Sequence, residues 1–222
     1  MSDANLQDVT PLFRRSLHDE LVERLRDMII EGQLVAGSRI HEGQIGIKLG
    51  VSRTPLREAL KYLASEGLIE LVAGRGAIVR VLTKRDVRNM LDVLIALETL
   101  AARSACRDAT EAQIAGVRKL HDEMMEFYRA GNRLEYYKLN QAIHTAMAAL
   151  SDNQFLSSTH ESIQSRLKRI RFIGNEQPEK WSGAVAEHEE MIVALEARDA
   201  DKLAEVIRLH LERTWERVKD TV

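Results

Sequence analysis

Residues 50–70 read GVSRTPLREALKYLASEGLIE, a tight turn followed by a short amphipathic helix. Ser52 or Thr54 can cap the start of this helix, and Pro55 suits its first turn, where the missing N–H leaves no bond unmade. The apolar positions that share the inward face are Leu56, Ala59, Leu60 and Leu63. The basic positions that share the opposite face, each four residues after the last, are Arg53, Arg57 and Lys61. This arrangement is typical of a helix that reads DNA.

The segments on either side of this helix predict a winged helix-turn-helix. Upstream, a longer helix over about 16–31 precedes a shorter one over 42–49, and the turn begins at Gly50. Downstream, Gly67 ends the helix, and β-rich runs over 68–72 and 77–82 flank a glycine-rich tip. We therefore expect a two-stranded wing that carries Arg75 at its tip.

A run of basic residues on a helix usually marks nothing more than a solvated face, and the distribution of charge separates that interpretation from DNA binding. Between Lys48 and Arg85 there are eight Lys or Arg residues and three Glu residues, whereas the whole chain has a formal charge of −2. The positive charge is thus concentrated where a phosphate-facing surface is expected. This concentration favours DNA binding.

The order of these elements resembles the winged helix of the GntR family of bacterial transcription regulators. The resemblance covers about residues 17–81 and is most specific over 50–60, 66–68 and 74–76. It implies that operator contacts come from the start of the third helix and from the wing-tip glycines: Ser52, Arg53, Thr54, Arg57, Gly74 and Gly76.

Three further positions complete this comparison. Lys61 lies on the same helix face as the arginines, and Arg75 lies between the two wing glycines, so both join the set of DNA-binding residues that we expect. Gly43 stands where some relatives carry a DNA-contacting arginine. We expect that contact to be absent.

Because one winged helix covers only a few base pairs, we expect a homodimer that binds an inverted repeat. We expect this dimer to act as a repressor.

Length and composition fit a protein of two domains. The 222 residues are 45% hydrophobic, with a single cysteine, so no disulfide can form within the chain. No apolar run is long enough for a signal peptide or a membrane span, which predicts a cytoplasmic protein without membrane contact. We expect a flexible leader over 1–13, a DNA-binding domain over 14–83 and an effector-binding domain over 84–222.

Beyond Thr83 the strand signals stop and helical patterns continue to the end of the chain. Breaks rich in Gly, Asn, Asp and Ser divide this half into six segments: 84–107, 110–130, 133–150, 154–173, 181–198 and 200–219. The fold class we expect is mainly α, a winged helix-turn-helix followed by an antiparallel six-helix bundle. This half resembles the FCD ligand-binding domain of the FadR-like branch of the GntR family, and its length is similar to the shorter VanR-like subgroup.

Three histidines and an amide are expected to meet inside the bundle. Asn140 and His144 are four residues apart and project from one helix face. His188 and His210 are equidistant from residue 199, which lies in the turn between the last two helices, so they sit opposite each other in an antiparallel pair. Each histidine alone, on its apolar face, is more often a packed core residue than a metal ligand. Three on different helices with an amide four residues away favour a metal site.

The resemblance to the FCD domain implies the same chemistry, because that family binds a divalent metal with a matching pattern. The pattern is carried here by Asn140, His144, His188 and His210. Imidazole ligands suit zinc, nickel or copper, with manganese or iron as further options, and zinc is our first choice. An amide and three neutral imidazoles leave the metal charge uncompensated, so the expected effector is a small carboxylate.

The residues that would hold such an acid are less clearly marked. Leu94 stands where many relatives carry an arginine, so His160, Arg166 and Arg169 are the candidates to replace it in the effector pocket. The alternative is that both arginines face solvent and that His160 is a core residue.

Two other functions have distinct requirements. A metal-dependent hydrolase would need a general base near the metal, and no His-Glu-x-x-His motif is present. A regulator that binds acyl thioesters would need a large apolar cavity and no metal. The sequence therefore favours a metal-dependent regulator over both.

Overall fold

The computed structural model describes residues 16–174 and 178–222. The leader expected over 1–13 lies outside the described residues, and so do residues 175–177, in the break expected between the fourth and fifth helices of the bundle. Within the described parts, none of the helices is both long enough and apolar enough to span a membrane.

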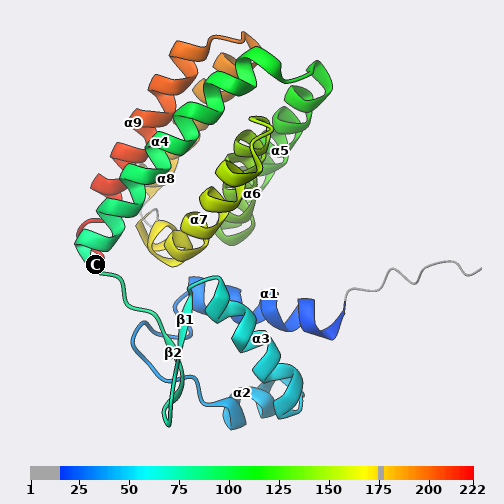
Figure 1. Ribbon diagram of the computed structural model, residues 1–222, viewed down its shortest axis with the longest axis vertical. Coiled ribbons are helices and arrows are strands. Elements are labelled where there is room, and N and C mark those ends of the chain that lie inside the picture. The colour runs from blue at the N-terminus through cyan, green and yellow to red at the C-terminus, as the bar shows by residue number, and fades with distance from the viewer. Residues whose placement is uncertain (1–15, 175–177) are drawn as a thin grey trace, which may run out of the picture.

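The N-terminal part is the winged helix-turn-helix that the sequence predicts (Figure 1). Its elements, in chain order, are α1 (Leu17–Ile30), α2 (Glu42–Leu49), α3 (Arg53–Ser65), β1 (Ile69–Val72) and β2 (Gly76–Val79). A capping box starts α1, in which the Ser16 hydroxyl accepts from the Asp19 N–H and the Asp19 side chain binds the Ser16 N–H. The turn between α2 and α3 is made by Gly50, whose φ of 67° suits a glycine.

The inward stripe of α3 is buried as its spacing predicts. Leu56, Ala59, Leu60 and Leu63 are all at most 1% exposed, and they form one cluster with apolar residues of α1, α2 and the wing. This core fixes α3 by its apolar side. The opposite side, which carries the basic residues, is left facing outward.

The wing is an antiparallel pair whose register places Ile69 opposite Val79 and Val72 opposite Gly76. Its second strand is shorter than the expected 77–82. Beyond Val79 the partner strand has ended, and a single bond from the Arg80 N–H to the Leu68 carbonyl continues the pairing. Gly74 and Gly76 have φ values of 72° and 79°, which side chains rarely adopt, so the tip requires glycine at both positions.

The C-terminal part consists of six helices, and their bounds confirm the predicted segments to within three residues. They are α4 (Lys84–Asp108), α5 (Glu111–Arg129), α6 (Arg133–Ala149), α7 (Gln154–Gly174), α8 (Pro178–Glu196) and α9 (Ala200–Val218). Capping boxes at Thr83 and Thr110 start α4 and α5. Figure 1 shows α4 and α9 running side by side along the length of the bundle. One large apolar cluster joins all six helices.

The two parts meet where α1 lies against α6 and α7 (Figure 1). Lys138 of α6 is 2.8 Å from Asp27 of α1, and Ile30 at the end of α1 belongs to the apolar cluster of the bundle. The helix that supports α3 is therefore also in contact with the helix that carries Asn140 and His144.

Candidate metal centre and nucleic-acid interface

The start of α3 is exposed, and Ser52 is its N-cap residue. The side-chain cap expected from Ser52 or Thr54 does not form at Ser52, whose hydroxyl makes no capping hydrogen bond. The reason is local: the third residue of the helix is Pro55, which has no N–H to donate. The Ser52 side chain is thus exposed at the tip of the helix.

A groove of about 570 Å³ lies between the wing, the start of α2 and the start of α3. Its lining brings together Arg53, Arg57, Gly74 and Gly76, which the sequence assigns to DNA contact. Arg39, a residue that the sequence analysis did not single out, joins them there, and its guanidinium lies beside Gly76. Its position in a loop far from the basic run on α3 gave no local signal.

Two of the expected DNA-binding cations are engaged in exposed ion pairs. Arg57 Nε lies 2.8 Å from Glu42 Oε2 of α2, and Lys61 Nζ lies 2.8 Å from Glu58 Oε1 on the same helix. Arg57 and Lys61 remain more than half exposed in these pairs, so solvent screens both interactions. Arg53, Thr54 and Arg75 are also exposed.

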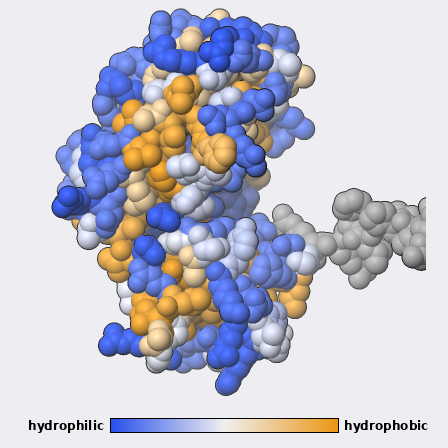
Figure 2. Space-filling view, in the orientation of Figure 1, coloured by the Kyte–Doolittle hydropathy of each residue, from blue (hydrophilic) through white to orange (hydrophobic). Residues whose placement is uncertain are grey.

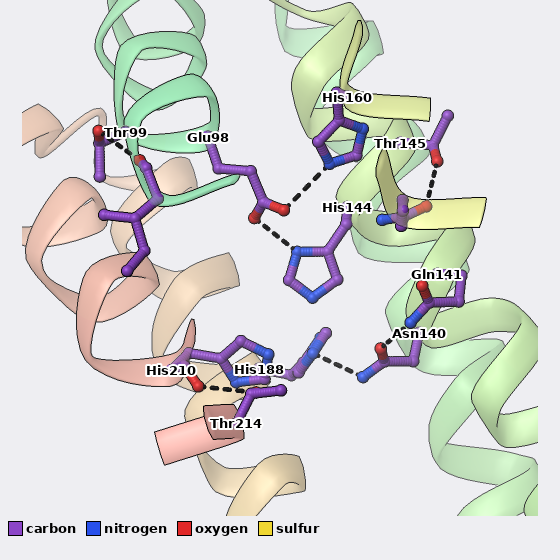
Figure 3. A network of polar contacts seen from close by, with 12 residues as sticks. Glu98, Thr99, Asn140, Gln141, His144, Thr145, His160, His188, His210 and Thr214 are labelled. Atoms are coloured by element: carbon purple, nitrogen blue, oxygen red, sulfur yellow. Dashed lines mark hydrogen bonds and ion pairs between the residues drawn. The ribbon is translucent and has the colours of Figure 1, made fainter. Parts of the chain in front are cut away.

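Inside the bundle, the three predicted histidines converge (Figure 3). His144 of α6, His188 of α8 and His210 of α9 are buried, with ring centroids 5.0 to 5.2 Å apart. One nitrogen of each ring lies within 4.8 Å of the others. Ligands at 2.0–2.1 Å from a tetrahedral zinc are about 3.3 Å apart, so small side-chain movements would complete such a site.

Two buried carboxylates orient two of these rings. Glu98 of α4 accepts a hydrogen bond from His144 Nδ1 at 2.8 Å and from His160 Nε2 at 3.0 Å, as Figure 3 shows. Glu187 accepts from His210 Nδ1 at 2.7 Å and also pairs with Arg213 and Arg217. A carboxylate on Nδ1 directs the lone pair of Nε2 toward the cluster, which is the arrangement common in metal sites.

The protonation states suit metal binding. Burial, together with the neighbouring imidazoles of His144 and His210, holds the pKa of His188 well below its usual range. Burial, His144 and Arg171 do the same for the pKa of His210, and burial also lowers the pKa of His144 although Glu98 opposes the shift. Burial alone would raise the pKa of Glu98, but its pairing with His144 and His160 holds it well below its usual range. Neutral imidazoles are the form that binds a metal.

Asn140 borders the cluster, and a chain of amides connects it to a buried arginine. Asn140 Nδ2 is 2.7 Å from His188 Nε2, and Asn140 Oδ1 accepts from Gln141 Nε2 at 3.0 Å (Figure 3). Arg171 of α7 approaches both Gln141 Oε1 and His144 Nε2 at 3.4 Å. Turning over the Asn140 amide would present its oxygen to the cluster.

The donor set fits a divalent cation. The Nε2 atom of His210 and the Nδ1 atom of His188 are buried and have no hydrogen-bond partner within the described residues. Buried polar atoms are rarely left unpaired in folded proteins, and a bound ion would provide a partner for these nitrogens. The three histidines with Asn140 could therefore hold a metal, and the metal would act as a positive centre for an anionic ligand.

The structure separates the three candidates for the effector pocket and agrees with the alternative that His160 is a core residue. His160 is buried and bonded to Glu98, so it belongs to the support of His144. Arg166 and Arg169 do not lie beside the histidines. They line a cavity at the junction with the wing, where Arg166 packs on Gly67. The reason is helical phase: His160, Gln164, Leu167 and Arg171 share the buried face of α7, whereas 166 and 169 fall on another face.

Sequence reasoning missed two functional groups that the spacing of buried positions could have revealed. Glu98 falls on the apolar stripe of α4, in phase with Leu91, Leu94 and Ala105, and a carboxylate in such a position needs a buried partner. Arg171 continues the buried stripe of α7 by one turn beyond Leu167. Arg171 thus brings an arginine close to His144 from a different helix than that of Leu94.

Two protein families match the two parts of the chain. Residues 17–79 match the gntR family of bacterial regulatory proteins, and residues 89–213 match the FCD domain.

The chain is also similar to curated regulators and to solved structures along most of its length. It is 31% identical to the Nta operon transcriptional regulator of Aminobacter aminovorans, over 84% of this chain and 87% of that protein. It is 26% identical to the HTH-type transcriptional repressor RspR of Escherichia coli, over 91% and 89% of the two chains. The structure of McbR/YncC of E. coli has the same fold, with a TM-score of 0.79 at 19% identity, covering 94% of this chain and 99% of that one.

Proposed function

Since the chain belongs to the GntR family of bacterial transcription regulators and carries an FCD domain, we propose that it is a repressor controlled by a small organic acid bound at a metal centre. The family is one of DNA-binding regulators, so the chain is not an enzyme, and the hydrolase considered above is set aside. The convergence of three buried histidines is the observation that carries the proposal.

We assign operator binding to residues 14–83. The set on α3 and on the wing comprises seven exposed residues and the half-buried Gly76: Ser52, Arg53, Thr54, Arg57, Lys61, Gly74, Arg75 and Gly76. The shared groove supports this assignment, because it would let α3 and the wing contact one stretch of duplex together. Arg53 and Arg57 are suited to guanine O6 and N7 in the major groove.

We propose a homodimer on an inverted repeat. Hydrophobic side chains gather on the face of the helical domain over α4, as Figure 2 shows. On α4 itself, Val93 and Leu100 are 44% and 53% exposed. Phe155 at the start of α7 is 85% exposed. Exposed apolar groups of this kind mark protein contact surfaces, and a second copy would bury them.

Within residues 84–222, we assign the metal to Asn140, His144, His188 and His210, with zinc as the first choice. Three imidazole nitrogens and an amide oxygen suit zinc, which can expand from four to five ligands when an anion is added. When bound, the metal supplies a positive charge that attracts an anion. Glu98 and Glu187 hold His144 and His210 in the tautomer that presents Nε2 to it.

The effector we propose is a carboxylate, because Arg171 adds a second positive group beside the metal ligands. A guanidinium can bind a carboxylate through two parallel hydrogen bonds. The dense array of buried polar atoms favours this class over an acyl thioester, which would require an apolar cavity. The six helices of this domain support placing the chain in the VanR-like subgroup.

Native mass spectrometry of the purified full chain tests the proposal, since it reads the subunit number, the metal and a co-purified acid together. We expect a dimer with one divalent metal per subunit, and elemental analysis would name the metal. Genomic fragments selected by the protein should share an inverted repeat. A metal-free protein after purification without chelators, which also failed to bind added zinc, would contradict the metal centre.

A further inference from the structure

A cavity of about 580 Å³ lies between the winged helix and the helical domain, away from the histidine cluster. One wall is α1, with Val22 and Arg26, and the opposite wall is formed by α6 and α7. Tyr62 of α3 also borders it. Since the lining comes from both parts of the molecule, a ligand here would contact the helix that reads DNA and the domain that holds the metal.

Lys168 of α7 is the cation in this lining that forms no direct ion pair within the described residues. Its ammonium makes no ion pair or hydrogen bond with any residue in the described parts of the chain. The other two cations are paired, since Lys138 binds Asp27 at 2.8 Å and Arg26 binds Glu66 at 2.7 Å. Burial and the charge of Arg26 lower the pKa of Lys168, although the charges of Glu66, Glu161 and Asp27 oppose the shift.

A second unsatisfied donor lies one turn before Lys168 on the same helix. Gln164 is 3% exposed, and its Oε1 accepts from Thr145 Oγ1 at 3.0 Å. Its Nε2 has no partner among residues 16–174 and 178–222. Positions 164 and 168 are four apart on α7, so both side chains project from one face. Both line the cavity.

Another part of the lining is suited to an apolar body, while Asp19, Glu23 and Asp27 of α1 add carboxylates on one side. Val22 and Ile30 of α1, Ala142 of α6 and the rings of Tyr62 and Tyr137 all border the cavity. Tyr62 is about half exposed and packs edge-on against His18 at 5.8 Å. An exposed aromatic ring next to aliphatic side chains provides contact area for a hydrophobic group.

We propose that this cavity is a second ligand site, which binds an organic anion with an apolar or aromatic body. The anionic group accepts hydrogen bonds from Lys168 Nζ and Gln164 Nε2, and the apolar body packs between α1 and the tyrosine rings. This site is separate from the metal centre, although Gln141 borders both: it lines the cavity and donates to Asn140. A ligand there fixes the position of α1, on which α3 packs, relative to the helical domain.

Benzoate is a suitable probe, since it combines one carboxylate with a ring, and acetate is the comparison without a ring. Calorimetric titration of the full chain, with the metal saturated and with the metal chelated, should show benzoate binding in both states and weaker binding of acetate. Lys168→Met keeps the aliphatic stem but removes the charge, so we expect at least about tenfold weaker benzoate binding. Lys119→Met, at an exposed lysine of α5, is the matched control and should bind as wild type.

A third variant distinguishes the loss of a ligand contact at Lys168 from a structural change caused by the Lys168→Met substitution. Ala142→Phe fills the cavity with a ring of its own, without changing any charge, and should abolish benzoate binding. The proposal is overturned if benzoate fails to bind the wild-type chain, or if Lys168→Met and Ala142→Phe bind it as the control does. It is also overturned if chelation removes all binding, because the metal centre would then be the anion site, as the proposed function holds.

Discussion

Two buried carboxylates, those of Glu98 and Glu187, distinguish this histidine cluster from three histidines that merely pack in a core. Glu98 accepts hydrogen bonds from His144 and His160, which come from different helices, and Glu187 does the same for His210. Carboxylates of this kind fix the tautomer and raise the basicity of a metal-binding imidazole. At the scale of the residue, the cluster is therefore organised as a metal site would require.

The variant Glu98→Gln tests this role directly. It keeps the size of the side chain but removes the charge that holds the Nδ1–H of His144, so metal affinity should fall by about 10–100-fold. Competition with a chelating dye would measure it. Glu123→Gln, at an acidic residue of α5 that faces solvent beside Lys119, is the control and should leave the affinity unchanged. Equal affinity in the two variants would show that Glu98 does not support the centre.

The lowered pKa values of His188 and His210 predict how stability depends on pH in the metal-stripped protein. Their folded pKa values lie below the unfolded value of about 6.5, so the unfolded state binds protons first as pH falls. The associated stability is fully present above about pH 6.5 and is lost as pH falls below it toward the folded pKa values. Urea unfolding at several pH values should show the free energy of unfolding decreasing below about pH 6.5, with a flatter profile in His188→Gln. An increase in that range would contradict the assignment of neutral imidazoles.

At the scale of the element, helical periodicity predicted much of what the structure shows. The buried stripe of α3 and all six helices of the bundle follow from spacing, because the apolar positions of each helix indicate the face it buries. The end of β2 did not follow from the sequence, since a strand ends where its partner does. The missing cap at Ser52 could have been predicted from Pro55, which removes the N–H that the cap requires.

The recognition helix is expected to determine base preference through Arg57. Arg57→Ala should cost about 1–3 kcal/mol of binding free energy on the operator and relax the preference at one base pair of each half-site. Fluorescence anisotropy with the operator and single-base variants, at one salt concentration, measures both effects. Arg208→Ala, at a partly exposed arginine of α9, is the control. Wild-type affinity in Arg57→Ala would show that the recognition surface lies elsewhere.

The wing is expected to contribute affinity without base choice. Arg75, between two glycines at the tip, can lie against phosphates or enter the minor groove, where the base code is degenerate. Arg75→Ala should weaken binding to all sequences by similar factors. It should also reduce the slope of log affinity against log salt concentration by about one, because one phosphate contact is lost. Titrations at several salt concentrations would show this. A change in base preference with general affinity unaltered would argue for direct base contact.

At the scale of the whole molecule, the sequence predicted contacts that depend on one turn and missed those that depend on packing. His188 and His210 meet because they are equidistant from the turn between α8 and α9, which can be counted along the chain. Arg171 reaches His144 from α7 only because of how α6 and α7 cross, and no local pattern determines that angle. The contact of α1 with α6 and α7 is of the same kind, and through it the bundle can affect the DNA-binding part.

The central claim is that an anion bound at the metal centre changes operator binding. A ligand can shift this equilibrium only by binding one conformation better, so removing the metal ligands must remove the response. The winged helix has its own core, and His188→Ala combined with His210→Ala should leave operator affinity unchanged in the absence of effector.

The most direct measurement is operator binding by wild type and by this double variant, with and without the acid that co-purifies with the wild-type protein. We predict that the acid changes the affinity of the wild-type protein and has no effect on the metal-free variant. A metal-free variant that responded to the acid like wild type would contradict the account and leave the three histidines as core packing.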